Sequence, residues 1–253
     1  MREILLYFSV KYNGNWDEIY SALKEKESIN YSLYKQILNR YKNKNYITII
    51  DNNYPKNLKK IAFPPFVIYY QGNIKLLNQK EIIWLFGAKF LESEKRIFYN
   101  LKNQFDQKNI IVVLGQSNPF ENAFIRNSNL KKMILVKDSG IDSQIIIDYK
   151  IEQKIIENKS LIISEFPDYN LPTKKRWYKS NKIKIGLSNG IFLYNTEKAQ
   201  DIFNVLSHVI LENKKIYCYT ESFYKYNLNY ELIKYGGIEI KDVGDIVKKW
   251  QKI

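Results

Sequence analysis

The densest run of positive charge in this chain lies between Lys174 and Lys184 and includes two aromatic residues. Its sequence, KKRWYKSNKIK, holds six cations and no acidic residue. Cations neutralise phosphates, and aromatic rings stack on unpaired bases. We therefore predict a surface for single-stranded nucleic acid, with Trp177 as the stacking residue. The cationic contacts would be Lys174, Lys175, Arg176, Lys179 and Lys182. The alternative is a solvated segment whose indole packs inward.

Two glycines that directly follow apolar runs are candidate phosphate contacts. Gly87 comes after Ile82–Phe86, and Gly115 comes after Ile110–Leu114. Loops at the carboxyl ends of parallel strands expose backbone amides, which favour phosphate. The G-x-G-x-x-G and G-x-x-x-x-G-K-[ST] patterns are absent, which argues against a nicotinamide enzyme and an ATPase. For each glycine the alternative is an ordinary turn between a strand and a helix.

Few side chains could support catalysis or hold a metal ion. His208 is the only histidine and Cys218 the only cysteine, so neither a Cys/His pair nor a histidine-rich metal site is expected. His208 falls within a helical pattern, where a packed or half-exposed position is typical. Asp138, Asp142 and Asp148 could in principle gather a divalent metal, but turn and surface roles are commoner. We predict no catalytic residue, no metal and no cofactor.

The composition indicates a well-packed protein that attracts polyanions. The 253 residues include 40 Lys and Arg against 26 Asp and Glu, which gives a net charge of +14. A lysine-rich background composition is the alternative source of this charge. The single cysteine excludes an intrachain disulfide and fits a reducing cytoplasm. The apolar run Ile4–Val10 ends at Lys11, and no run approaches the roughly 20 residues of a membrane span. We expect neither a signal peptide nor a membrane segment.

Apolar runs with strand character alternate with helical patterns from Ile82 onward. The expected strands are Ile82–Phe86, Ile110–Leu114, Met133–Val136, Leu161–Ile163, Gly190–Tyr194 and Lys215–Tyr219, with a short last strand at Ile238. The expected helices are Ser93–Phe105, Tyr149–Asn158, Ala199–Glu212 and Tyr226–Tyr235, with a final one from Val243. This alternation predicts parallel strands joined by right-handed crossovers, and hence a doubly wound α/β sheet.

The chain is predicted to have three parts. In residues 1–45, apolar residues three or four positions apart form two short groups, Trp16–Leu23 and Leu33–Leu38, which predict a small helical N-terminal domain. Residues 46–80 form a docking segment, in which Pro64-Pro65 hold the chain extended. Residues 81–253 form the main, nucleic-acid-binding domain.

Several motifs in one order resemble the DNA-processing protein A family, called DprA or Smf. The segment Tyr54–Leu77, YPKNLKKIAFPPFVIYYQGNIKLL, leads into the apolar run that ends at Gly87. Ser164-Glu165-Phe166-Pro167 matches the family pattern S-E-[YF]-P. Leu171–Trp177 stands where the family has a proline-rich loop that ends in an aromatic residue. Asn181 and Gly186-Leu187-Ser188 fall within its R-N-R-I-I-A-G-L-S run.

The resemblance implies an extended Rossmann-like fold with a mostly parallel sheet. It implies a cytoplasmic, non-enzymatic protein that binds single-stranded DNA, protects incoming strands during natural transformation and passes them to the RecA recombinase. It also implies a homodimer. Lys174 and Trp177 take the positions at which the family contacts the strand, and Asn181 is carried over as a further contact. Glu165 is expected to be a structural acceptor of hydrogen bonds.

Two loops depart from the family pattern. Gly87-Ala88-Lys89 stands where the family has G-[TS]-R, so the phosphate role passes to Lys89 without the bidentate fork of arginine. The pattern S-G-x-A-x-G-I-D is replaced by LGQSNPFE, in which Pro119 has no amide hydrogen to offer. Polar groups could still be presented there by Gly115, Gln116, Ser117 and Asn118. The family run S-G-S-[LI]-I-T-A, aligned with Gln200–Leu206, is lost.

Two other functions stay open at this point. A diverged Rossmann-fold interaction protein with weak DNA binding would explain the lost motifs. An enzyme like the nucleotide phosphoribohydrolases would share the topology, but their P-G-G-x-G-T-x-x-E motif is absent.

Overall fold

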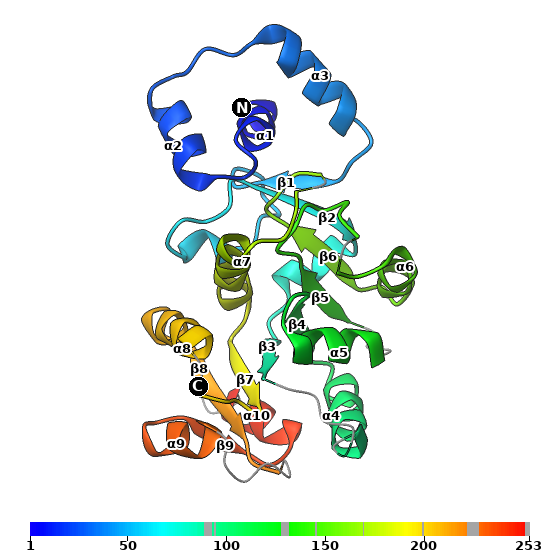
Figure 1. Ribbon diagram of the computed structural model, residues 1–253, viewed down its shortest axis with the longest axis vertical. Coiled ribbons are helices and arrows are strands. Elements are labelled where there is room, and N and C mark those ends of the chain that lie inside the picture. The colour runs from blue at the N-terminus through cyan, green and yellow to red at the C-terminus, as the bar shows by residue number, and fades with distance from the viewer. Residues whose placement is uncertain are drawn as a thin grey trace.

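Nine strands form one sheet in the part of the chain that the structure describes. The computed structural model describes residues 1–88, 93, 95–127, 132–144, 146–168, 170–198, 200–221 and 228–250. The strands are β1 (Tyr46–Thr48), β2 (Val67–Gly72), β3 (Ile82–Gly87), β4 (Ile111–Gly115), β5 (Met133–Val136), β6 (Leu161–Ser164), β7 (Gly190–Tyr194), β8 (Lys215–Tyr219) and β9 (Ile238–Ile240). Their order is β1-β2-β6-β5-β4-β3-β7-β8-β9 (Figure 1).

The strand order reverses beside β3. From β3 the chain adds β4, β5 and β6 on one side, then crosses back to place β7 on the other side. These pairs are parallel, whereas β2 pairs antiparallel with β6, and β1 pairs antiparallel with β2. Every residue of β3 to β7 is buried, as expected for parallel strands covered on both faces. Where the order reverses, the carboxyl ends of the strands leave a crevice that can hold a ligand.

Helices cover both faces of the sheet. They are α1 (Arg2–Lys11), α2 (Trp16–Lys24), α3 (Tyr31–Tyr41), α4 (Lys95–Gln107), α5 (Pro119–Asn127), α6 (Tyr149–Glu157), α7 (Lys174–Leu187), α8 (Gln200–Leu211), α9 (Leu228–Lys234) and α10 (Val243–Trp250). Short 3-10 turns, η1 (Leu58–Lys60) and η2 (Ile74–Asn78), lie before β2 and β3. Because strand side chains alternate, Ile83 and Leu85 face the core under α4 and α5, and Trp84 faces the core under α7.

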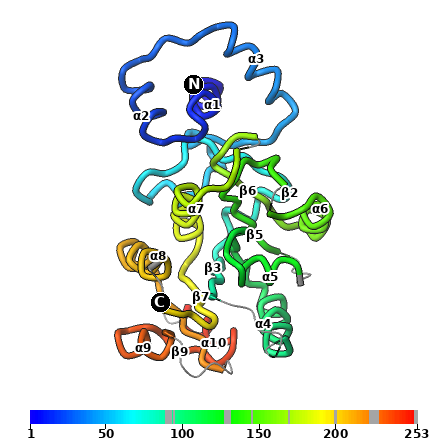
Figure 2. Tube along the Cα trace, viewed as in Figure 1, coloured from blue at the N-terminus to red at the C-terminus, as the bar shows by residue number. Residues whose placement is uncertain are grey.

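The N-terminal helices pack around α1 (Figure 2). The apolar run that the sequence showed at Ile4–Val10 is this central helix, which buries Leu5, Leu6, Tyr7 and Phe8. They belong to the same hydrophobic core as Val67 and Tyr69 of β2. The predicted doubly wound α/β fold with a helical cap is therefore confirmed. The division into domains at residues 45 and 80 stays a prediction.

The segment expected as a loop through Trp177 is helical from Lys174 onward. Thr173 is the N-cap of α7, and its hydroxyl oxygen accepts a hydrogen bond from Arg176 N at 3.2 Å. The prediction failed because α7 has charged or polar residues on most of its surface, so no apolar stripe with a helical period precedes Ile183. The sequence analysis also did not predict α5, which begins at Pro119.

None of the helices in the described ranges is both long enough and apolar enough for a transmembrane span.

Candidate nucleic-acid interface

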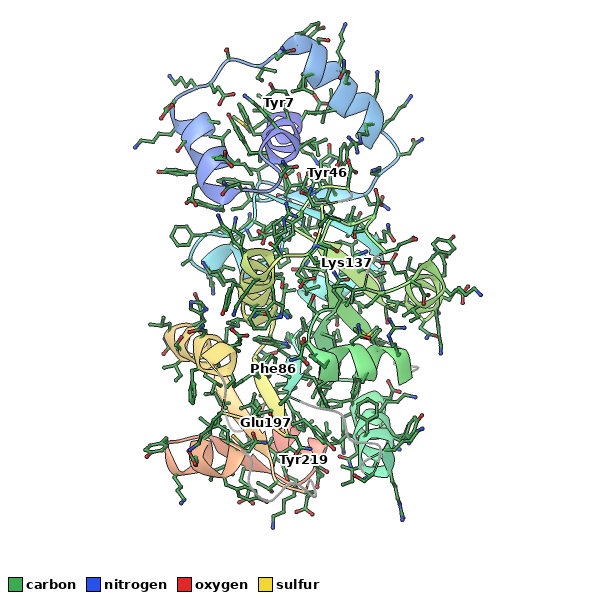
Figure 3. The ribbon with its side chains drawn as sticks, viewed as in Figure 1. Tyr7, Tyr46, Phe86, Lys137, Glu197 and Tyr219 are labelled. Carbon is green, nitrogen blue, oxygen red and sulfur yellow. The ribbon has the colours of Figure 1, made fainter. Side chains whose placement is uncertain are left out.

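A cleft of about 1020 Å³ opens at the carboxyl ends of the central strands. Its walls come from the start of α5, the start of α7 and the connection between β7 and α8. Figure 3 labels two of its lining residues, Phe86 at the end of β3 and Glu197 after β7. The cleft therefore lies where the strand order reverses, which is the place that this fold class offers to ligands.

The loop after β4 forms one wall of the cleft with polar side chains that bond to the loop after β5. Gln116 Nε2 donates to Asp138 Oδ1 at 2.7 Å and to Ser139 Oγ at 2.8 Å. The Ser117 hydroxyl also donates to the Asp138 carboxylate. Asn118 Oδ1 accepts from Glu121 N at 3.0 Å and so caps α5. These three predicted phosphate contacts line the cleft, but the side-chain donors of Gln116 and Ser117 are already engaged, and Asp138 adds a negative charge.

A buried ion pair anchors the loop that carries Asp138. The neighbouring Lys137 is completely buried, and its ammonium donates to Ile141 O at 2.9 Å and to Glu152 Oε1 at 2.5 Å. Burial raises the pKa of Glu152, and the Lys137 ammonium opposes that rise. The buried Lys137 thus ties the segment after β5 to α6.

Both predicted glycines are required by close packing. A Cβ on Gly115 would lie 2.5 Å from Lys184 Nζ, and one on Gly87 would lie 2.6 Å from Tyr194 O. Lys184 is itself buried, 3.7 Å from Glu121 Oε1, and Trp84 Nε1 donates to that same oxygen at 2.7 Å. Burial lowers the pKa of Lys184 and raises that of Glu121, while their attraction opposes both shifts. The glycines thus keep β3 and β4 close to the residues packed against them.

The first turn of α7 brings an indole and an ammonium group to the cleft. Trp177 is partly buried against the core and also lines the cleft. Lys174 is 71% exposed at its side chain, with Nζ 3.2 Å from Asp201 Oδ1. Tyr178 donates to the same carboxylate oxygen at 2.6 Å and lies edge-to-face with the indole, with 5.0 Å between centroids. The hydrogen bond from Lys174 to Asp201 raises the pKa of the ammonium.

The other cations of this segment do not reach the cleft. Successive helix residues are about 100° apart, so a dense run of charge is spread around the helix. Arg176 Nη2 donates to Asn170 Oδ1 at 2.6 Å, and Lys179 and Lys182 line a different pocket. Lys175 is exposed. None of these four side chains lines the cleft, so a single strand-binding surface that they share with Trp177 stays a prediction.

Asn181 and Lys89 are the remaining predicted contacts. Asn181 is only 1% exposed, and neither of its amide atoms has a hydrogen-bond partner within the described ranges. A buried side chain cannot contact a strand at the surface, so Asn181 is left out of the interface. Lys89 lies outside the described residues.

The sequence analysis missed Arg126 as a cation of the cleft. Arg126 is exposed on α5, where its Nε donates to Asn122 Oδ1 at 2.6 Å and its Nη2 donates to Ile146 O at 2.8 Å. No motif or local charge density marks it, because only the packing of α5 against β3 and β4 brings it to the cleft. Among the described residues, no group of His, Cys, Asp and Glu could hold a metal ion.

A family model and a curated protein that match this chain both concern DNA processing protein A. The family model for DNA recombination-mediator protein A matches residues 45–251. The DNA processing protein DprA of Streptococcus pneumoniae is 26% identical over 155 residues, which cover 58% of this chain and 52% of that protein. The chain thus spans about half the length of this curated relative.

Two solved structures share the fold. The X-ray structure of DNA processing protein A from Streptococcus pneumoniae superposes with a TM-score of 0.74 at 17% identity, covering 97% of this chain and 92% of that one. The second is DNA processing protein A from Helicobacter pylori, whose structure was described with its single-stranded DNA binding mode. It superposes with a TM-score of 0.67 at 18% identity, covering 82% of this chain and 96% of that one.

Proposed function

Because this chain belongs to the DNA recombination-mediator protein A family, we propose that it binds single-stranded DNA in the cleft at the carboxyl ends of the sheet. The observation that carries the proposal is Trp177, a partly buried indole that lines this cleft beside the exposed ammonium group of Lys174. A partly buried ring next to an exposed cation suits an unpaired base and its phosphate.

Each side chain in the cleft would have a distinct role. The Trp177 indole would stack on a base, a contact worth about 1 to 3 kcal/mol. Lys174 of α7 and Arg126 of α5 would neutralise phosphates. Asp138, Glu197 and Asp201 also line the cleft and would repel phosphate, so the backbone of the strand would pass close to Lys174 and Arg126.

The cellular role that we propose is the one that the family resemblance implies. The protein would act without catalysis in the cytoplasm, protect single strands during transformation and pass them to the RecA recombinase. It would do so as a homodimer. Membership of the family supports this part of the proposal.

A titration with a fluorescent oligothymidine tests the strand-binding proposal. Anisotropy is measured at two salt concentrations, with a duplex of the same length as the competitor. We expect the strand to bind more tightly than the duplex, and its affinity to fall with salt by a slope of about 0.7 for each neutralised phosphate. Equal affinity for strand and duplex would contradict the proposal and favour a diverged interaction protein.

A further inference from the structure

A second pocket lies between the cap and α7, with a volume of about 240 Å³. Its lining comes from the start of α2, from the chain before β2, from the end of β6 and from the middle of α7. The volume is several times the roughly 30 Å³ that a water molecule occupies, and it is below the roughly 300 Å³ of small drug-sized sites. The pocket therefore suits one planar ring system.

Glu165 contributes a buried carboxylate to this pocket. The residue is 7% exposed, and its Oε1 has no hydrogen-bond partner among the residues that the structure describes. Burial raises the pKa of this carboxyl to about 7, against the attraction of Lys179, Lys182 and Arg176. Buried polar groups are nearly always hydrogen-bonded, so an unpaired carboxylate on a pocket wall indicates a ligand that brings donors.

Phe63 contributes an aromatic ring that is held in an unfavourable conformation. Its backbone has φ of 61°, in the left-handed region that bulky residues rarely adopt, and the residue is 53% exposed. Neither the strain nor the exposure helps folding, and strain of this kind clusters at ligand sites. The ring lies edge-to-face with Trp16, 4.9 Å between centroids, and Trp16 is fixed by donating from Nε1 to Pro64 O at 2.9 Å.

Two lysines supply positive charge beside the ring and the carboxylate. Lys182 Nζ lies 5.1 Å from the centroid of Phe63, and Lys179 lines the same pocket one turn earlier on α7. Asp17, which is exposed at the start of α2, is the opposing charge. The pocket thus combines an exposed aromatic ring, a buried carboxylate and two lysines.

We propose that this pocket binds a guanine base with its phosphate. Among the four bases, guanine alone presents two adjacent N–H donors, N1–H and N2–H₂, on its Watson–Crick edge, and an ionised carboxylate accepts both. The base stacks on the exposed ring of Phe63, and Lys179 and Lys182 hold the phosphate. The indole of Trp16 is already stacked on Tyr20 and Phe66, so it supports the Phe63 ring from the side. The guanine can come from a free nucleotide or from a single strand. This inference does not depend on strand binding in the cleft, which a separate titration tests.

Isothermal titration of the full chain with dGMP, dAMP, dCMP and dTMP tests the inference. It is run at about pH 8, where a carboxyl group of pKa about 7 is ionised. We expect saturable binding of dGMP that is at least about tenfold tighter than that of the other three nucleotides, because each lacks one of the two donors. Binding of dAMP as tight as that of dGMP would overturn the proposal.

Two variants and a control separate the pocket from unspecific binding. Glu165→Gln keeps the shape but not the two acceptor oxygens, and we expect it to lose at least about tenfold in dGMP affinity. In Phe63→Gly, glycine tolerates the positive φ and the ring is removed, so the variant should bind all four nucleotides more weakly. Tyr149→Ala, at another exposed aromatic residue, should bind dGMP as the unchanged chain does. A Glu165→Gln protein that is folded by circular dichroism and binds dGMP with unchanged affinity would refute the assignment.

Two oligonucleotides identify the source of the guanine. A thymidine tract with one central dG is compared with the uniform tract. Tighter binding of the dG tract, lost in Glu165→Gln, assigns the pocket to a base within a strand. Equal binding of both tracts together with tight dGMP binding assigns it to a free nucleotide. If neither dGMP nor the dG tract is preferred, the proposal fails, whatever the affinity of the cleft for thymidine.

Discussion

Trp177 is the residue on which the proposed strand binding most depends, because it is the aromatic residue that α7 brings to the cleft. We expect Trp177→Ala to weaken oligothymidine binding by about tenfold, because one stacked base is worth about 1 to 3 kcal/mol. The salt slope should not change, since no charge is removed. Anisotropy titrations at two salt concentrations measure both quantities. Tyr235→Ala, at an aromatic residue that is 87% exposed, is the control. An unchanged affinity in Trp177→Ala would mean that the indole serves only the core.

Glu165 lowers the stability of the folded protein as the pH rises. In the folded protein its pKa is raised from 4.5 to about 7, mainly by burial, so the folded state holds this proton more tightly than the unfolded chain does. Folding stability therefore falls as pH rises between those two values, by on the order of 3 kcal/mol, and then levels off. Glu165→Gln should be more stable than the unchanged protein above about pH 7 and equal to it below about pH 4.5. Urea unfolding on both sides of this window tests it, and the same stability difference at both pH values would refute it.

At the scale of elements, the position of α7 decides what the cleft contains. Its N-cap, Thr173, lies directly before the turn that carries Lys174 and Trp177. Asp148 caps α6 in the same way, accepting from Ile151 N at 3.0 Å, but α6 contributes nothing to the cleft. The two caps form a matched pair for separating helix stability from strand binding.

We expect Thr173→Ala and Asp148→Ala each to cost about 1 kcal/mol of unfolding free energy, because each leaves a helix N–H group without its acceptor. Only Thr173→Ala should also weaken oligothymidine binding, by several-fold, because the first turn of α7 frays. Thr173→Ser should restore both properties, since serine caps as well. Urea unfolding and anisotropy titration measure the two effects. Equal losses of binding in the two alanine variants would show that α7 has no special role.

At the scale of the whole molecule, the cap and the sheet share one hydrophobic core. Ion pairs in the segment after β6 also connect the cap to the sheet domain. Asp168 Oδ2 lies 2.6 Å from Arg40 Nη2, and Asp168 Oδ1 lies 2.5 Å from Lys44 Nζ. The same Lys44 Nζ lies 2.7 Å from Asp142 Oδ2. Asp168 is 5% exposed, so these pairs are better shielded from water than ordinary surface pairs.

We expect Asp168→Asn to lower the free energy of unfolding by about 1 to 3 kcal/mol, because two cations lose a shielded partner. Asparagine tolerates the positive φ of 43° at this position. Far-UV circular dichroism and tryptophan fluorescence should report one coincident urea transition, since the core is continuous. Glu231→Gln, which removes an exposed pair with Lys198, should change little. A separate early transition would show instead that residues 1–45 form an independent domain.

The sequence alone was sufficient to predict the order of the strands from β3 onward, and of the helices between them except α5 and α7. Strands buried on both faces are continuous apolar runs, and Gly87 and Gly115 mark their ends. The family motifs likewise follow from local sequence. These features can be predicted because each depends on residues that are neighbours in the chain.

Only the tertiary structure decided which side chains meet. The charge density at Lys174–Lys184 predicted one basic surface, but the helical period sends Lys174 and Trp177 to the cleft and Lys179 and Lys182 to the pocket beside the cap. Arg126 lines the cleft together with Lys174, and Phe63 lines the second pocket together with Glu165, across long sequence separations. Such contacts depend on how distant elements pack, and composition, spacing and periodicity carry no information about that packing.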